Sequence, residues 1–325
     1  MKMVQTEEPT TTTESITEDE AALYDRQIRL WGLEAQNRLR NSSVLLVGLS
    51  GAGAEIAKNL MLAGLKSLTL MDHNNVSEGD RDAQFLAPVD TIGQNRAEAS
   101  RLRTEQLNPM VHVIVDTDAL ESKDADFFEK FNLVCLVNQS YEQIERVNEI
   151  CRKFNIKMCA AGVYGWFGYG FSDLLEHEFI DEVKMLAPSN STEVHVLDGK
   201  GDGPEAKKRK VDEEETAMIK HTIDFSSWSD AMNVDWSRKT TLGKAKRSLT
   251  PAYFVIRSLL EAQKLGDKAT SPEVISKAWK DEVERCKLVL EEQKCKPEDF
   301  MKFISGELGP VCAIIGGVVA QEVIK

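Results

Sequence analysis

Apolar residues in the first half of the chain come in short runs that alternate with segments of helical periodicity. The runs lie at 44–47, 68–71, 111–115, 133–137 and 156–160, and helices are predicted at 55–63 and 141–153. Short apolar runs separated by helices are typical of strands in a parallel sheet that is covered on both faces. The pattern therefore predicts an α/β fold with a doubly wound, mostly parallel sheet.

Changes in composition divide the chain into five segments. Residues 1–20 are acidic and rich in Thr, which predicts a disordered tail, and residues 21–180 form the first part of the sheet domain. Residues 181–215 are predicted to be a linker, because 199–215 combine Gly and charged residues without periodicity. Residues 216–295 are predicted to be a small, mostly helical insertion with helices near 253–264 and 275–290.

Residues 296–325 are predicted to return to the sheet domain through a final helix that starts near Pro310. Gly316 and Gly317 are expected to allow close backbone packing. Apolar residues are predicted to form one stripe that belongs either to the core or to an interface: Val311, Ile314, Ile315, Val318, Val319 and Val323. The helical pattern reaches Lys325 without a cap, so we expect a truncated C-terminus.

Charge and cysteine spacing exclude several classes of function. The net charge of −13 is opposite to that of most nucleic-acid binders, and no apolar run reaches the length of a membrane span. The six cysteines form no CxxC pair, so no metal site is predicted and a reducing compartment is favoured. We therefore expect neither nucleic acid nor membrane as a partner.

A glycine-rich turn, Gly48-Leu49-Ser50-Gly51-Ala52-Gly53, follows the first predicted strand. Its spacing differs from GxGxxG, but small residues before a helix still let a phosphate approach backbone N–H groups. Asp72 ends the second strand, where an acid can bind ribose hydroxyls. The nucleotide-binding candidates are therefore Gly48, Ser50, Gly51, Gly53 and Asp72. The alternative is a tight strand–helix turn with an acidic cap.

A nicotinamide-dependent oxidoreductase is a competing hypothesis for the same turn. Such an enzyme needs a His or Lys acid/base beside the nicotinamide. No histidine lies in an evident catalytic loop, and a structural or solvated role is expected for all five: His73, His112, His177, His195 and His221.

Several separated motifs, in a consistent order, resemble the activating enzymes of ubiquitin-like modifiers, the ThiF/MoeB-like family. They are YDRQIRLWG at 24–32, Gln84-Phe85-Leu86, Asn108-Pro109, and the segments 162–170 and 309–325. Chain length and the position of the insertion are most similar to the small, Aos-type subunits that serve SUMO. The resemblance implies a Rossmann-like adenylation fold and a heterodimer with a large Uba-type subunit.

In that family, ATP and Mg²⁺ serve to adenylate the C-terminal glycine of the modifier, which then forms a thioester with a cysteine. The resemblance implies that the partner subunit holds ATP, Mg²⁺ and the cysteine, and that SUMO and a conjugating enzyme are bound through the complex. It leaves open a small subunit for another ubiquitin-like modifier.

Departures from the family pattern imply that this chain's own pocket is vestigial, so no cofactor is firmly predicted in this chain. The alternative is a weakly occupied nucleotide site, because Asp72 and the glycines persist. Ser50 replaces a glycine, Ala83 replaces an arginine that would face phosphate, and Gln139 replaces a magnesium-binding aspartate. Asp80 and Asp82 would repel a triphosphate, and Arg96 stands where the family has a lysine. All six cysteines are expected to be structural thiols: Cys135, Cys151, Cys159, Cys286, Cys295 and Cys312.

The resemblance also implies a role for the segment that precedes the first strand. Arg26 is expected to act in trans on the partner's ATP site, and Arg29 is the second choice. The alternative is that both arginines form surface ion pairs with Asp25 or Glu34. Leu30 and Trp31 are expected to be anchors, and Trp31 is expected to pack on the parent sheet.

Four basic residues in the predicted linker form a candidate nuclear import signal: Lys207, Lys208, Arg209 and Lys210. The alternative is a solvated loop. Together with the resemblance, the cluster predicts a largely nuclear location, with some protein also in the cytoplasm.

Overall fold

The structure, a computed structural model, describes residues 17–185, 215–235, 249–264, 271–286 and 297–325. The chain divides into two compact units, one of residues 1–175 with 226–325 and the other of residues 176–225. The predicted tail up to residue 16, the basic cluster 207–210 and Cys295 lie outside the described residues.

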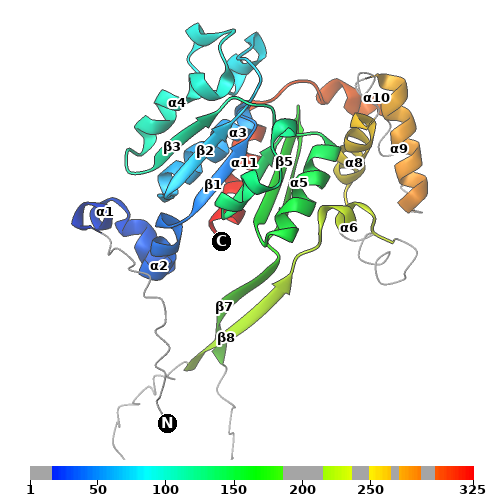
Figure 1. The fold of residues 1–325 in the computed structure, drawn as a ribbon. Coiled ribbons are helices and arrows are strands. Elements are labelled where there is room, and N and C mark those ends of the chain that lie inside the picture. Colours follow the sequence, from blue (N-terminus) through cyan, green and yellow to red (C-terminus); the bar gives the residue numbers. More distant parts are fainter. Residues whose placement is uncertain (1–16, 186–214, 236–248, 265–270, 287–296) are drawn as a thin grey trace, which may run out of the picture. The chain divides into compact units, whose positions relative to one another are not determined.

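The larger unit is built on a six-stranded sheet with the order β3-β2-β1-β4-β5-β6 (Figure 1). The first five strands are parallel, and β6 runs antiparallel to β5. This confirms the predicted doubly wound, mostly parallel sheet. The strands are β1 (Ser43–Val47), β2 (Ser67–Met71), β3 (His112–Asp116), β4 (Leu133–Val137), β5 (Lys157–Tyr164) and β6 (Phe167–Asp173).

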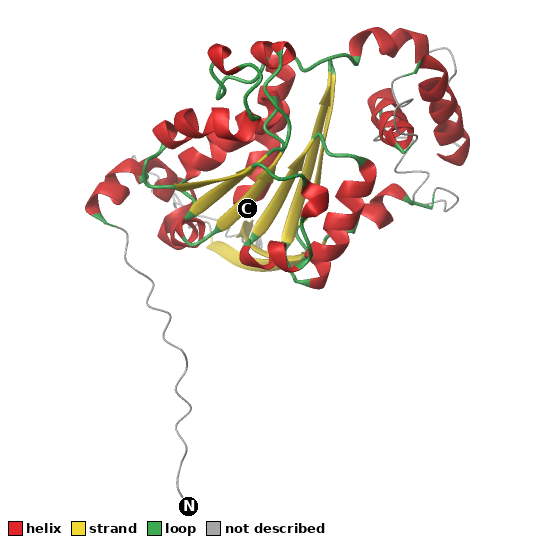
Figure 2. Ribbon diagram, turned by 45° about the horizontal axis from the view of Figure 1, so that its top comes forward, coloured by secondary structure: helices red, strands yellow, loops and turns green. Residues whose placement is uncertain are grey.

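Helices cover both faces of this sheet (Figure 2). One layer contains α3 (Gly51–Ala63), α4 (Arg96–Leu107) and α11 (Gly309–Ile324). The opposite face packs against α5 (Tyr141–Lys153), α6 (Trp228–Met232) and α8 (Pro251–Gln263). The strand order reverses between β1 and β4, and ligands of this fold class bind at the carboxyl ends of such strands.

Short helices complete the larger unit, and α1 (Glu18–Leu23) and α2 (Asp25–Arg40) precede the sheet. Residues 18–20, which were predicted to belong to the tail, form the first turn of α1, capped by Thr17. The other helices in the described residues are η1 (Glu78–Asp82), η2 (Val89–Thr91), η3 (Leu120–Ser122), η4 (Asp126–Lys130), α9 (Pro272–Cys286), α10 (Pro297–Phe300) and η6 (Met301–Phe303).

The smaller unit is an antiparallel hairpin of β7 (Glu176–Met185) and β8 (Glu215–Asp224). The segment that was predicted to be helical from residue 216 therefore begins as a strand. Its helical character starts at α6 and continues in α8 and α9. Phe254 of α8 and Trp279 of α9 form a separate apolar cluster with Phe300 of α10.

The final helix, α11, differs from the predicted single stripe. Val319 is buried, whereas 65% of Ile314 and 53% of Val318 are exposed. Gly316 permits close packing as expected, because an added Cβ would lie 2.5 Å from the Cβ of Glu55, but nothing lies within 4 Å of such an atom at Gly317. The helix is apolar on all sides, so sequence periodicity could not separate its core face from its exposed face.

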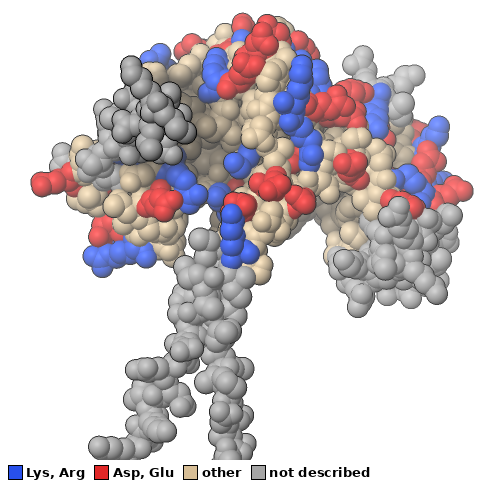
Figure 3. Space-filling model, turned by 60° about the horizontal axis from the view of Figure 1, so that its bottom comes forward, with Lys and Arg blue, Asp and Glu red and all other residues tan. Residues whose placement is uncertain are grey.

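Charged side chains are interspersed on the surface. On the face shown in Figure 3, the described Lys and Arg residues lie among Asp and Glu residues and apolar surface. Within the described part of the chain, no helix is both long and apolar enough to cross a membrane.

Four cysteines of the larger unit are buried in the core: Cys135, Cys151, Cys159 and Cys312. Burial raises the pKa of Cys151, Cys159 and Cys312 to about 12, and it raises the pKa of Cys135 as well. The thiolate is the reactive form of cysteine, so these four thiols are poor nucleophiles. For these four, the prediction of structural thiols is confirmed.

We predict that iodoacetamide at pH 8 leaves these four thiols unmodified in the folded protein. A thiol whose pKa is about 12 is ionised in only about one molecule in ten thousand at pH 8, because each unit below the pKa lowers the thiolate fraction tenfold. Peptide mass mapping measures the modification, with protein unfolded in guanidinium as the control. Labelling of any of the four at the rate found in unfolded protein would contradict this account.

Candidate functional site

The glycine turn lies where β1 ends and α3 begins, and its glycines are required by close packing. Gly48 has φ of 93°, and a Cβ there would lie 2.2 Å from the carbonyl oxygen of Val137 at the end of β4. A Cβ on Gly53 would lie 2.0 Å from the carbonyl oxygen of Gly48. The turn thus brings the start of α3 directly against the strand ends, as in a nucleotide-binding fold.

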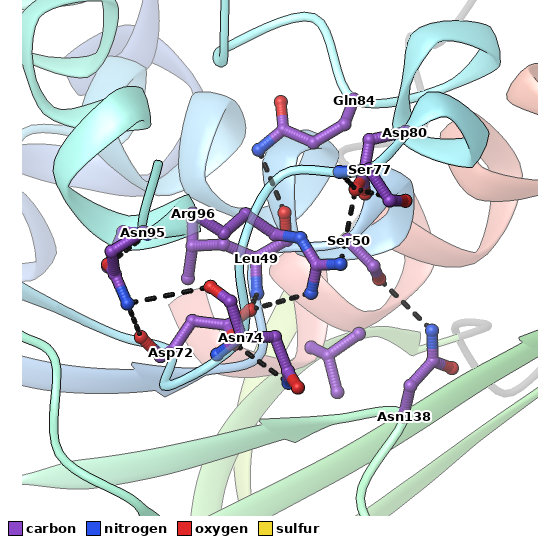
Figure 4. Close-up of polar contacts among 12 residues, drawn as sticks. Leu49, Ser50, Asp72, Asn74, Ser77, Asp80, Gln84, Asn95, Arg96 and Asn138 are labelled. Atoms are coloured by element: carbon purple, nitrogen blue, oxygen red, sulfur yellow. Dashed lines mark hydrogen bonds and ion pairs between the residues drawn. The ribbon is translucent and has the colours of Figure 1, made fainter. Parts of the chain in front are cut away.

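Asp72 lies beside this turn with only 3% of its surface exposed. One carboxylate oxygen accepts from the N–H of Leu49 at 2.8 Å and from Arg96 at 3.0 Å, and the other accepts from the N–H of Asn74 at 2.9 Å (Figure 4). Both oxygens that could bind ribose hydroxyls therefore already have partners within the chain.

Arg96, at the start of α4, is held by two acids. Its guanidinium pairs with Asp72 at 3.0 Å and with Asp80 at 3.2 Å. Burial alone would lower the pKa of Arg96, but the two ion pairs raise it above its usual value. The charge of Arg96 is thus balanced by its two acidic neighbours, Asp72 and Asp80.

The start of α3 is in contact with a residue that sequence reasoning missed. The carboxylate of Glu307 accepts from the N–H of Gly51 at 2.6 Å and from the hydroxyl of Ser50 at 2.8 Å. Asn138 donates to the Ser50 hydroxyl at 3.0 Å and also to the carboxylate of Glu307. Glu307 lies 257 positions from Ser50, and no local pattern marks it.

Ala83 also packs over the turn. A Cβ added to Gly51 would lie 2.4 Å from the Cβ of Ala83 and 2.9 Å from an oxygen of Glu307. Ala83, where the resemblance implies an arginine, therefore contributes only a methyl group here, next to a carboxylate.

The residues after β4 are used for backbone contacts. Asn138 has φ of 53°, and its side-chain oxygen accepts from the N–H of Val163 at 2.9 Å. Gln139 donates to the carbonyl oxygen of Val137 at 2.8 Å. Among the residues that the structure describes, no group of three or more His, Cys, Asp and Glu side chains is arranged to hold a metal ion.

The YDR segment is anchored at a different place, on the end of α3. Tyr24 is buried, and its hydroxyl accepts from Asn108 at 2.8 Å. Gln27 donates to the carbonyl oxygen of Leu62 at 2.9 Å. A Cβ on Gly64, which has φ of 83° as expected for a helix cap, would lie 2.5 Å from the Tyr24 ring. These contacts hold the start of α2 in one orientation.

The two arginines of this segment differ. Arg29 pairs with Asp25 at 3.1 Å, which is the surface ion pair that was the alternative to a functional role. Arg26 is exposed, and no described residue forms an ion pair or hydrogen bond with it. The structure therefore separates the two candidates, which sequence reasoning had ranked only by resemblance.

Leu30 and Trp31 lie on a groove between helices. Trp31 donates to Gln36 at 3.0 Å, and 79% of Leu30 is exposed. The groove has a volume of about 630 Å³ and lies between α2, the end of α3 and α11, with Leu62, Gly317 and Ile324 among its lining residues. Leu30 is thus not an anchor to the core, and Trp31 faces this groove.

The chain resembles known proteins over nearly its whole length. It matches the ThiF family over residues 24–325. It is 45% identical over 316 residues to SUMO-activating enzyme subunit 1 of Xenopus tropicalis, across 95% of this chain and 89% of that protein. It is 44% identical over 318 residues to the human protein of the same name, across 95% and 88%.

Among solved structures, one similar fold is an Escherichia coli tRNA N6-threonylcarbamoyladenosine dehydratase in complex with AMP. It is 21% identical, covers 50% of this chain and 66% of that chain, and has a TM-score of 0.42. The matches over the full sequence decide the assignment: this chain belongs to the ThiF family and, within it, to the SUMO-activating enzyme subunit 1 proteins.

Proposed function

We propose that this chain completes the ATP site of a larger partner subunit and performs no chemistry in its own pocket. The partner, of the Uba type, binds ATP and Mg²⁺, adenylates the C-terminal glycine of SUMO and takes SUMO as a thioester. SUMO and the conjugating enzyme bind through the complex. The single observation that carries the proposal is Arg26, an exposed arginine on a rigidly anchored helix.

Arg26 has the chemistry that a transferring phosphoryl group requires. A guanidinium is permanently charged and matches phosphate oxygens with a planar fork of N–H donors. Since Arg26 has no described partner, it keeps its full charge for a ligand outside the chain. Tyr24 and Gln27 lie on either side of Arg26, and their hydrogen bonds to Asn108 and Leu62 fix the backbone of this segment. Arg26 can therefore bind a phosphate of the partner's ATP without the entropic cost of ordering a loop.

The chain's own pocket offers no comparable unpaired arginine among the described residues. Its arginine, Arg96, is neutralised by Asp72 and Asp80, and the start of α3 is neutralised by Glu307. A triphosphate in this pocket would meet carboxylates and no unpaired cation. This favours ATP binding in the partner and argues against both a working adenylation site and a dinucleotide site here.

The described cysteines support a nucleophile on the partner. Four of them, Cys135, Cys151, Cys159 and Cys312, are buried, and burial raises their pKa values. A thioester requires an accessible thiolate. The thioester is therefore proposed to form on the large subunit.

The groove beside α2 and α11 supports an obligate partner. Leu30, Leu62, Ile314 and Val318 are all at least 46% exposed. Leu30 and Leu62 line the groove, and Ile314 and Val318 lie on α11, the helix that contributes Gly317 to it. Contiguous exposed apolar surface is typical of a protein interface. We propose that the large subunit covers this face.

SUMO is the favoured modifier because the chain is 44–45% identical, over 95% of its length, to SUMO-activating enzyme subunit 1 proteins. The competing oxidoreductase finds no support in the geometry, because His73, His112 and His221 are exposed and lie outside the contacts of the glycine turn. A largely nuclear location is proposed from the basic cluster 207–210 together with the resemblance to the activating enzymes.

We predict that Arg26→Ala lowers the rate of SUMO-dependent pyrophosphate exchange by the assembled heterodimer by about 100-fold, as expected for the loss of one donor to transition-state charge. Arg26→Lys should restore only part of the rate, because a point charge replaces a planar fork. The large subunit is titrated to confirm that complex formation is unchanged.

Arg29→Ala is the matched control, since Arg29 lies one helical turn away and is paired with Asp25. It should retain a rate within about twofold of the unmodified complex, because a surface ion pair contributes little. The proposal fails if Arg26→Ala is as active as this control.

We predict that Val318→Asp weakens binding to the large subunit by at least about tenfold, because it places a charge in a desolvated apolar contact. Surface plasmon resonance measures the dissociation constant. Leu102→Asp is the control, because Leu102 is 65% exposed on α4, a helix that contributes no residue to the groove. Unchanged binding by a folded Val318→Asp variant would exclude this face.

A further inference from the structure

We propose that Glu307 is a built-in closing group, whose carboxylate holds the phosphate end of this chain's own pocket shut. The contact is autoinhibitory, since the chain supplies the anion that the start of α3 would otherwise accept from a ligand. This inference concerns the chain's own pocket and stands independently of the role proposed for Arg26.

Three donors converge on this one carboxylate, and they come from two separate elements. The N–H of Gly51 and the hydroxyl of Ser50 come from the start of α3, and the side-chain amide of Asn138 comes from the end of β4. Asn138 is held in place because its oxygen accepts from the N–H of Val163. The donors that bind this carboxylate are therefore positioned by the fold itself, at the start of α3 and the end of β4.

The charge of Glu307 suits this position. The start of a helix carries a partial positive charge and unpaired N–H groups, so an anion there is stabilised. A phosphate approaching Gly51 would meet a like charge at hydrogen-bond distance and would have to displace it. Steric packing acts in the same direction, since Ala83 and Glu307 both lie over Gly51.

Glu307 is delivered by a segment that is itself tied to the sheet. Gly165 at the β5–β6 turn donates to the carbonyl oxygen of Gly306 at 2.8 Å, and Trp166 donates to that of Phe303 at 2.8 Å. Glu307 then precedes α11, which packs along α3. The same segment therefore both places Glu307 over the glycine turn and leads the chain back to the sheet in α11.

Asp72, the candidate for binding the ribose of a nucleotide, is also occupied by side chains of the same chain. Asp72 is bound to Arg96, and Arg96 is bound to Asp80. That network uses residues 72–96, which are close in sequence, whereas Glu307 reaches the turn from the other end of the chain. Glu307 is thus the group that can be removed without disturbing the network around Asp72.

The test uses the full chain and inorganic phosphate as the probe. Thermal unfolding is followed with 0 to about 50 mM phosphate while NaCl holds the ionic strength constant. The unmodified chain should show no phosphate-specific change in Tm. Glu307→Ala should unfold at a lower temperature without phosphate, and its Tm should rise saturably, by about 2–4 °C, as phosphate fills the vacated seat.

Glu105→Ala is the matched control, because it removes one carboxylate of an exposed pair with Arg101 on α4. It should show no phosphate-specific response. If Glu307→Ala does not fold, Glu307→Gln is used instead, because it keeps the side-chain volume and removes the charge. Its Tm should rise saturably with phosphate, by less than that of Glu307→Ala. The proposal is overturned if the folded variant at position 307 responds to phosphate no more than Glu105→Ala does.

Discussion

The rest of this site depends on one constraint: the N–H groups at the start of α3 have no partner within the helix and need an acceptor from elsewhere. The helix begins against the ends of β1 and β4, where Gly48 and Gly53 leave no room for side chains. Buried donors at a helix start require an acceptor, and the helix dipole favours an anionic one. In many folds of this class the acceptor is a bound phosphate. Here it is the carboxylate of Glu307.

In the function that we propose, this substitution of an internal acid for a ligand lets the fold persist without chemistry in its own pocket. Arg96 and Asp72 satisfy each other in the same manner. The pocket is thereby converted into a structural connection between the glycine turn, the end of β4 and the return helix. The cation that we propose for an external phosphate is Arg26, on a helix held by contacts of Tyr24 and Gln27.

Local patterns predicted the sheet well. The runs at 133–137 and the helix at 141–153 coincide with β4 and α5, because strands buried on both faces must be apolar throughout and α5 has one apolar face. Gly64 ends α3 in the left-handed region, which favours glycine. Such features depend only on near neighbours in the sequence.

The failures have a common physical cause in tertiary context. Helix α11 is apolar on every side, so its exposed residues Ile314 and Val318 could not be told from its buried residue Val319. Strand β8 takes its structure from pairing with β7. Glu307 meets Ser50 across 257 positions, and Arg29 differs from Arg26 only through a contact with Asp25.

The most direct test of the account is the number of ATP molecules bound by the isolated chain and by the heterodimer. Equilibrium dialysis with labelled ATP and Mg²⁺ measures both. The account predicts no binding to the isolated chain and one ATP per heterodimer, at the partner's pocket. Two ATP molecules per heterodimer, or saturable binding to the isolated chain, would contradict it.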